Sequence, residues 1–150
     1  MKALVVYDSV YGNTEKIARA IGEALASSGE VKIVRAGEAN AAALASIDLL
    51  IVGAPTQSGK PTLAVQEFLG KIPANALKNI RVASFDTRVK VFIAKLFGYA
   101  AGRIADSLKA KGGNLAAPPE GFLVKGKEGP LVDGELERAA AWAKGLIAGK

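Results

Sequence analysis

The chain has 150 residues, and its 20 Lys and Arg against 14 Asp and Glu give a formal net charge of +6. Half of the residues are hydrophobic, which is enough for the core of a single domain over residues 1–150. Cysteine and histidine are both absent from the sequence, which excludes disulfides, iron–sulfur clusters, thiolate or imidazole metal sites and Ser-His-Asp catalysis.

Short runs rich in Val, Ile and Leu alternate along the chain with segments whose apolar residues recur at helical spacing, a pattern typical of a parallel α/β sheet. The predicted strands are Ala3–Tyr7, Val31–Arg35, Leu49–Ala54, Arg81–Phe85 and Asn114–Ala117 continuing to Phe122–Val124. The predicted helices are Asn13–Ser28, Ala39–Ala45, Thr62–Ile72, Tyr99–Lys111 and Glu135–Ile147, with Thr62 and Asp133 as N-caps. No apolar run approaches membrane-spanning or signal-peptide length, so we expect no membrane span and a cytoplasmic location.

Strand composition predicts the order of the sheet. Leu4–Val6 and Leu49–Val52 are apolar throughout, as in strands buried on both faces, whereas Val31–Arg35 contains charged residues and fits an edge. Pro118 and Pro119 cannot donate ladder hydrogen bonds, which places the fifth strand at the other edge. Both constraints fit a doubly wound, five-stranded parallel sheet of order 2-1-3-4-5. Right-handed crossovers then create a binding crevice at the carboxyl ends of strands one, three and four.

The turn after the first strand, Asp8-Ser9-Val10-Tyr11-Gly12-Asn13-Thr14-Glu15, opens a helix. Amide groups at the helix start, the positive end of its dipole and the hydroxyls of Ser9 and Thr14 can together bind the oxygens of one phosphate group. No metal is needed for such a site. The alternative is that Gly12 and Asn13 serve only a tight turn and a helix cap.

Two other phosphate-binding patterns do not match. The dinucleotide fingerprint needs three spaced glycines, whereas the turn has only Gly12, and Arg35 stands in place of the acid after the second strand. The Walker pattern needs Gly-Lys followed by Ser or Thr, whereas here Gly59-Lys60 is followed by Pro61. A site for NAD or for nucleoside triphosphate hydrolysis is therefore not predicted.

The turn Ser9-x-Tyr11-Gly12-Asn13-Thr14-Glu15 resembles the mononucleotide phosphate loop of the flavodoxin family, and the chain length and strand order agree with that resemblance. The resemblance implies a flavodoxin-like three-layer sandwich with FMN as its cofactor. Ser9, Gly12, Asn13 and Thr14 would hold the FMN phosphate, and the backbone of Val10 and Tyr11 would complete the cradle. Tyr11 occupies a position where the family commonly has a residue with a small hydroxyl side chain.

The resemblance also implies that the loops after the third and fourth strands hold the flavin ring. On the inner side of the ring the contacts would come from Pro55, Thr56, Gln57, Ser58 and Gly59, where family members often present an aromatic ring. The pyrimidine edge and outer face would be reached by Phe85, Asp86, Thr87 and Arg88, with Phe85, Phe92, Phe97 and Tyr99 as candidate stacking residues. Phe85 fits a strand core as well. Arg88 is either a fixed cation that favours the reduced ring or a solvated side chain.

These features predict an FMN-binding protein that mediates electron transfer without a catalytic side chain. Flavodoxin electron carriers are as a rule acidic, so a chain of charge +6 is expected to dock on a redox partner protein with an acidic face. The same charge leaves open an FMN-dependent oxidoreductase acting on a quinone or porphyrinogen. A third alternative is a flavin-free interaction module. Nucleic acid is not an expected partner, because Lys and Arg are scattered along the chain.

Overall fold

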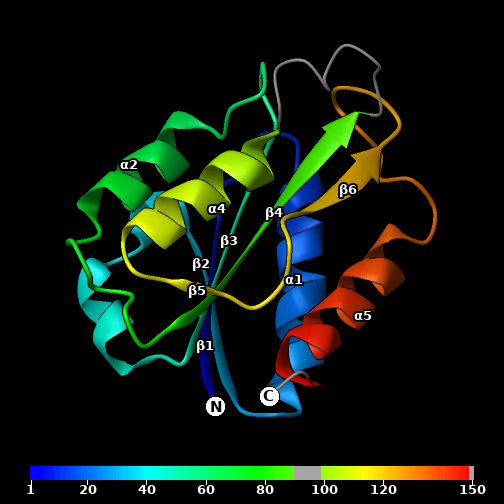
Figure 1. The fold of residues 1–150 in the computed structure, drawn as a ribbon. Coiled ribbons are helices and arrows are strands. Elements are labelled where there is room, and N and C mark those ends of the chain that lie inside the picture. The colour runs from blue at the N-terminus through cyan, green and yellow to red at the C-terminus, as the bar shows by residue number, and fades with distance from the viewer. Residues whose placement is uncertain (90–98, 149–150) are drawn as a thin grey trace.

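Six parallel strands form the central sheet of the computed structural model, which describes residues 1–89 and 99–148 (Figure 1). They are β1 (Lys2–Tyr7), β2 (Glu30–Arg35), β3 (Leu49–Pro55), β4 (Arg81–Val89), β5 (Asn114–Leu115) and β6 (Glu120–Val124). The order is β2-β1-β3-β4-β5, and β6 also pairs with β4. This confirms the predicted order. Two short strands share the fifth position because Pro118 and Pro119, which cannot donate ladder hydrogen bonds, lie between them.

Burial along the strands matches their place in the sheet. All residues of β3 from Leu49 to Ala54 are buried, whereas no residue of β2 is fully buried. A strand between two neighbours and under two helix layers needs apolar side chains on both faces, and an edge strand does not. The charged residues of β2 are therefore accommodated at the edge, as predicted.

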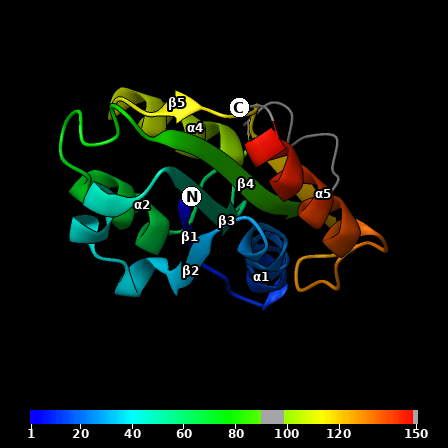
Figure 2. The same ribbon diagram turned by 90° about the horizontal axis from the view of Figure 1, so that it is seen from below.

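Helices cover both faces of the sheet (Figures 1 and 2). α1 (Asn13–Ala26) and α5 (Glu135–Ala148) lie on one face, and α2 (Leu63–Lys71) and α4 (Ala100–Ala110) lie on the other. The predicted helix Ala39–Ala45 is instead two 3-10 segments, η1 (Ala36–Glu38) and η2 (Ala41–Ser46). Leu44 is the one buried residue of η2, so the alanines there bury too little surface to stabilise a full helix.

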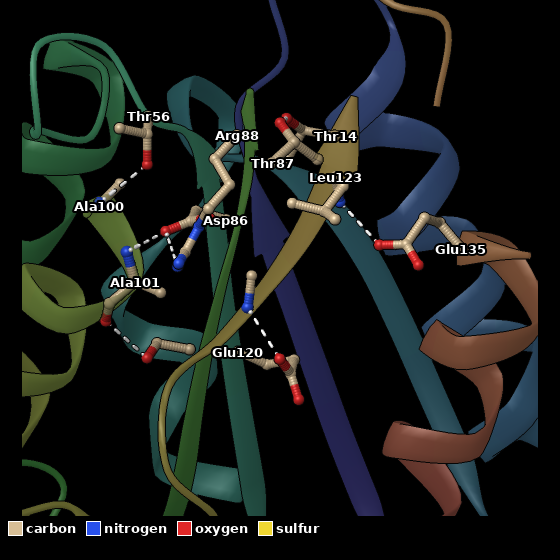
Figure 3. A network of polar contacts seen from close by, with 12 residues as sticks. Thr14, Thr56, Asp86, Thr87, Arg88, Ala100, Ala101, Glu120, Leu123 and Glu135 are labelled. Atoms are coloured by element: carbon tan, nitrogen blue, oxygen red, sulfur yellow. Dashed lines mark hydrogen bonds and ion pairs between the residues drawn. The ribbon is translucent and has the colours of Figure 1, made fainter. Parts of the chain in front are cut away.

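β4 is longer than predicted. It continues through polar residues past its predicted end at Phe85 and ends at Val89. Asp86 and Thr87 stay in the strand because β3 and β6 pair with them from both sides, and Arg88 stays in it through its pairing with Leu123 of β6. Side chains alternate along a strand, so Asp86 and Arg88 face α4 whereas Thr87 faces α1 (Figure 3). The polar end of β4 thus supplies side chains to both helix layers.

β6 continues into a hairpin over residues 123–132, which we call the 123–132 hairpin. Its arms are joined by backbone hydrogen bonds from Lys125 N to Pro130 O, 2.8 Å, and from Val132 N to Leu123 O, 2.9 Å. The tip is a β-turn closed by Gly129 N donating to Gly126 O at 2.9 Å. The hairpin extends from β6 at the same end of the sheet as the carboxyl end of β4 (Figure 1).

Two predicted helix caps are not formed as expected. α5 starts at Glu135, directly after Gly134 with its φ of 89°, so Asp133 is not the residue that precedes the helix. Thr62 does occupy the N-cap position of α2, but its side chain makes no capping bond. Within the part of the chain that the structure describes, its buried Oγ1 has no hydrogen-bond partner. The sequence therefore predicts where α2 starts, but it does not predict whether the Thr62 side chain makes the capping hydrogen bond.

Glu135 ties the start of α5 to the base of the hairpin. Its Oε2 accepts a hydrogen bond from Leu123 N at 2.7 Å, and both carboxylate oxygens bind Arg138. The hydrogen bond from Arg138 lowers the pKa of Glu135, and burial opposes that effect. The carboxylate is therefore held in its charged form in the folded protein.

Replacing Glu135 with Gln is expected to lower the free energy of unfolding by about 1 to 2 kcal/mol at neutral pH. Because the folded-state pKa of Glu135 lies below its ordinary value of 4.5, its stabilisation is complete above that value and is lost as the pH falls through the folded-state pKa. Urea unfolding at neutral and acidic pH measures both effects. The exposed Glu137 of the same helix provides the control, and equal losses in E135Q and E137Q would contradict the assignment.

Candidate functional site: a cleft at the carboxyl ends of the strands

A cleft of about 310 Å³ lies where the strand order predicts it, at the carboxyl ends of β1, β3 and β4. Its walls come from the loop after β1, the loop after β3, the end of β4 and the 123–132 hairpin. The lining residues are Ser9, Val10, Tyr11, Asn13, Thr14, Pro55, Thr56, Gln57, Ser58, Thr87, Arg88, Val89, Val124 and Lys127. The predicted site residues Gly12, Gly59, Phe85 and Asp86 do not line it.

The Ser9 hydroxyl organises the loop after β1. Its Oγ accepts hydrogen bonds from Gly12 N at 3.1 Å and from Glu15 N at 3.3 Å. Gly12 is the N-cap residue of α1 and has a φ of 92°, a left-handed conformation that glycine adopts without strain. Because the Ser9 oxygen acts as acceptor in both bonds, its own proton remains available to a ligand in the cleft.

Four amide groups of this loop are left as donors. In residues 1–89 and 99–148, no acceptor is found for the N–H groups of Val10, Tyr11, Asn13 and Thr14. Asn13 and Thr14 belong to the first turn of α1, whose amides lack partners within the helix. Several unpaired amides at the positive end of a helix dipole form a donor set that fits a phosphate group.

Thr14 and Thr87 join the first loop to β4. Their Oγ1 atoms lie 2.7 Å apart, and the two residues are only 1% and 4% exposed (Figure 3). Of two bonded hydroxyls, one donates and the other keeps its proton. The pair can therefore donate one further hydrogen bond to a ligand in the cleft.

Arg35, at the end of β2, fastens the loop from its outer side. Nη1 donates to Asp8 Oδ1 at 3.4 Å and to Ser9 O at 3.1 Å, and Nη2 donates to Glu15 Oε1 at 3.3 Å. The guanidinium also lies 5.3 Å from the centre of the Tyr7 ring. The two carboxylates nearest the loop are thus paired, which lowers their repulsion of an anion.

A tight turn forms the second wall. Gln57 and Lys60 exchange two backbone hydrogen bonds of 2.8 and 2.9 Å, and the residues between them, Ser58 and Gly59, have φ values of 51° and 78°. Positive φ at both central positions is typical of a type I′ turn. Gly59 is buried and its carbonyl accepts from Arg103 Nε at 2.7 Å, so it shapes the turn instead of lining the cleft.

Asp86 lies beneath the cleft and bonds both to Arg88 on its own strand and to the start of α4. It is fully buried, and its Oδ1 and Oδ2 accept hydrogen bonds from Arg88 Nε at 2.7 Å and Nη2 at 2.8 Å. Oδ2 also accepts from Ala101 N at 2.9 Å, while Thr56 Oγ1 accepts from Ala100 N at 2.9 Å (Figure 3). Asp86 and Thr56 therefore cap the amides at the start of α4.

Arg88 is fixed on three sides. Besides its pairing with Asp86, its Cζ lies 3.4 Å from the centre of the Tyr99 ring. On β6, a Cβ added to Gly121 would come within 2.2 Å of the same carbon, so the guanidinium fills the space that this glycine leaves. Arg88 is not the solvated side chain that was one of the two expectations, because its side chain is only 20% exposed and is fixed by its ion pair with Asp86. The negative charge of Asp86 reduces the positive potential that Arg88 contributes to the cleft.

Of the aromatic residues proposed for ring stacking, the two that the structure describes, Phe85 and Tyr99, do not line the cleft. Phe85 is fully buried and packs edge-to-face with Phe122 at 6.1 Å and Trp142 at 6.2 Å between ring centres. The structure therefore corrects the expectation that Phe85 contacts the flavin ring. Phe92 and Phe97 lie outside the described residues.

Sequence reasoning missed three lining residues, Val89, Val124 and Lys127. Val89 joins the cleft because β4 runs past its predicted end. Val124 and Lys127 do so through the parallel pairing of β6 with β4, a contact between distant parts of the chain. The position of the turn that carries Lys127 depends on this strand pairing, which local sequence does not show.

The structure gives no sign of a metal site or a membrane span in the part of the chain that it describes. No group of three or more Asp, Glu, His or Cys side chains there could hold a metal ion. None of the described helices is long and apolar enough to cross a membrane.

Comparisons with known proteins agree with this architecture. A flavodoxin of the domain Archaea has 23% identity and a TM-score of 0.82, covering 99% of this chain and 98% of that one. Flavodoxin 1 from Bacillus cereus has 18% identity and a TM-score of 0.83, with the same coverages of 99% and 98%. Rubredoxin oxygen:oxidoreductase from Desulfovibrio gigas has 21% identity and a TM-score of 0.78, and this chain covers only 35% of it. At these identities the likeness shows a shared fold.

The family itself is shown by sequence. No curated protein gives a match. A family model described as Flavodoxin matches residues 5–142, a range that includes the loops after β1, β3 and β4. Flavodoxins bind FMN and transfer electrons to redox partner proteins. The resemblance noted in the first loop is therefore confirmed, and the chain belongs to the flavodoxin family.

Proposed function

We propose that this chain binds FMN in the cleft and carries electrons between redox proteins. The observation that supports this best is the donor set after β1: four amides without acceptors together with the hydroxyls of Ser9 and Thr14. When bound, FMN supplies the redox chemistry, so no side chain has to act as an acid or a base. The task of the protein is then to bind, orient and shield the cofactor.

In this proposal the phosphate lies in the loop after β1. Val10, Tyr11, Asn13 and Thr14 donate their amides, Ser9 donates its hydroxyl, and the N-terminus of α1 adds its dipole. A phosphate carries a charge of about −1.5 to −2 near neutral pH, and each hydrogen bond to a charged group is stronger than a neutral one. The phosphate is therefore expected to provide most of the affinity.

The flavin ring is proposed to lie between the other two walls. Pro55, Thr56, Gln57 and Ser58 form one of them, and the end of β4 with Arg88 and Val89 forms the other. Among the described lining residues Tyr11 alone is aromatic, and it lies in the phosphate loop. Ring stacking from the loop after β3 is absent there, so the ring is expected to be held less tightly than the phosphate.

The partner is proposed to present an acidic face. The chain has a net charge of +6, and the carboxylates of Asp8, Glu15 and Asp86 are each paired with an arginine. Lys60, on the turn after β3, is exposed, and no ion pair involves it within the described residues. Electron exchange with an acidic partner should therefore slow as salt is raised, and a rate that rises with salt would contradict this docking mode.

The net charge also supports a second candidate function, an FMN-dependent oxidoreductase acting on a quinone or porphyrinogen. A basic flavodoxin-family chain differs from the acidic carriers that dock on basic reductases, and turnover of its own substrate would remove the need for such docking. A cytoplasmic location stays a prediction for either function.

Titration of the purified protein with FMN tests both candidates, with quenching of flavin fluorescence as the readout. A yellow complex that is reduced only through a separate reductase supports the carrier. Turnover of NAD(P)H with a quinone, without a reductase, supports the oxidoreductase. A protein that stays colourless and leaves flavin fluorescence unchanged contradicts both and favours the flavin-free interaction module.

A further inference from the structure

The 123–132 hairpin lies against the start of α1, although the two segments are far apart in the sequence. Asn13 Nδ2 donates a hydrogen bond to Glu128 O at 3.2 Å. Asn13 is only 8% exposed, so its amide is covered by the turn above it. The residue that provides a predicted phosphate-binding amide therefore also anchors the tip of the hairpin.

Gly129 makes this close approach possible. A Cβ added to Gly129 would lie 2.6 Å from both Oδ1 and Nδ2 of Asn13, and Gly129 has a φ of 98°. A side chain at this position would therefore collide with Asn13 and strain the backbone. Gly126, at the other end of the same turn, has only Gly129 O within 4 Å of an added Cβ, at 3.9 Å. Only one of the two glycines is needed for the contact.

The contact brings a lysine to the cleft. Lys127 and Glu128 are the central residues of the turn, and Lys127 lines the cleft together with Ser9, Asn13 and Thr14. Lys127 makes no ion pair within residues 1–89 and 99–148, and neither does the exposed Glu128 beside it. Lys125, two residues earlier, is exposed and does not line the cleft.

We propose that Lys127 is a specificity residue whose ammonium group neutralises the phosphate of the bound cofactor, so that the hairpin selects FMN over riboflavin. This inference rests on the proposed function. The loop after β1 offers only neutral donors, amides and hydroxyls, to a group that carries close to two negative charges. An ammonium group on a flexible stem supplies the missing positive charge and follows the phosphate without fixed geometry.

The test compares Lys127→Gln with Lys125→Gln, two neutralisations on the same hairpin that lower the net charge equally. Binding of FMN and of riboflavin is measured by quenching of flavin fluorescence at low and high salt. For K127Q we expect the Kd for FMN to rise about 5- to 20-fold at low salt, less at high salt, with the Kd for riboflavin changed less than about twofold. For K125Q we expect both values to stay within about twofold of those of the unmodified protein.

A second pair of variants tests the position of the hairpin without changing charge. Gly129→Ala displaces the turn from Asn13, so it is expected to weaken FMN binding about as much as K127Q does and to leave riboflavin binding little changed. Gly126→Ala is the control and should bind both flavins normally. Circular dichroism and thermal unfolding verify that each variant is folded.

The outcomes separate the inference from the proposed function. If the unmodified protein binds FMN but K127Q and K125Q weaken it equally, or if K127Q weakens riboflavin as much as FMN, the assignment of Lys127 is wrong and the cofactor site stands. If the unmodified protein binds neither flavin, the proposed function is wrong and the assignment of Lys127 is wrong with it. FMN-selective weakening in K127Q and G129A, without an effect in K125Q and G126A, supports the proposal.

Discussion

Replacing Asp86 with Ala is expected to lower the free energy of unfolding by about 3 to 5 kcal/mol. The carboxylate is fully buried and accepts three hydrogen bonds, two from Arg88 and one from Ala101 N. Its loss leaves a largely buried guanidinium and a buried amide without their acceptor, which costs more than the pair contributes when it is intact. Urea unfolding of the apoprotein measures the difference.

A double variant identifies the cause of that loss. Asp86→Ala combined with Arg88→Met removes both charges and keeps an apolar side chain against the Tyr99 ring. If an uncompensated Arg88 charge causes most of the loss, the double variant should recover about half of it, and Arg88→Met alone should be destabilised by the unpaired carboxylate. Strictly additive effects of the two substitutions would show that the ion pair does not couple them.

The second large effect is expected at the phosphate loop. Ser9→Ala combined with Thr14→Val removes two hydroxyl donors and the acceptor of two loop amides. Hydrogen bonds to a charged group contribute about 1.5 to 3 kcal/mol each, so the Kd for FMN should rise about 100-fold or more. Riboflavin lacks the phosphate, and its Kd should change less than about threefold. Fluorescence titration with each flavin gives both values.

Ser27→Ala combined with Ser28→Ala is the matched control, because it removes two exposed hydroxyls at the other end of α1. This variant should bind FMN as the unmodified protein does. A loss of riboflavin affinity equal to the loss of FMN affinity in the Ser9 and Thr14 variant would place the phosphate elsewhere. Thermal unfolding of both variants shows whether the loop change affects the fold.

Much of the fold follows from local sequence patterns. A strand's place in the sheet decides how much of it is buried, and burial decides its composition. The buried β3 is therefore apolar, and the edge strand β2 contains charged residues. The strand order, the helix layers and the first loop were predictable for this reason. In the loop after β1 only the bonds from Gly12 N and Glu15 N to Ser9 Oγ are local, whereas the side chains of Asn13 and Thr14 bond to distant residues, Glu128 and Thr87.

Features that depend on contacts between distant segments were not predictable. Asp86 and Arg88 read as loop residues, yet pairing with β6, and for Asp86 also with β3, keeps them in a strand. Asp86 finds its amide partner on α4. Lys127 reads as a residue of a surface turn, and the pairing of β6 with β4 together with the contact between Glu128 and Asn13 brings it to the cleft. Phe85 alternates with Asp86 along β4, so its ring enters the core on the opposite face.

The central claim is that the loop after β1 binds the phosphate of FMN. The most direct test is to follow the backbone amide resonances of nitrogen-15-labelled protein while FMN or riboflavin is added. The account predicts that FMN produces its largest shifts at the amides of Val10, Tyr11, Asn13 and Thr14, and that riboflavin at equal occupancy leaves these four nearly unchanged. Equal shifts with the two flavins, or FMN-induced shifts confined to residues away from this loop, would contradict the account.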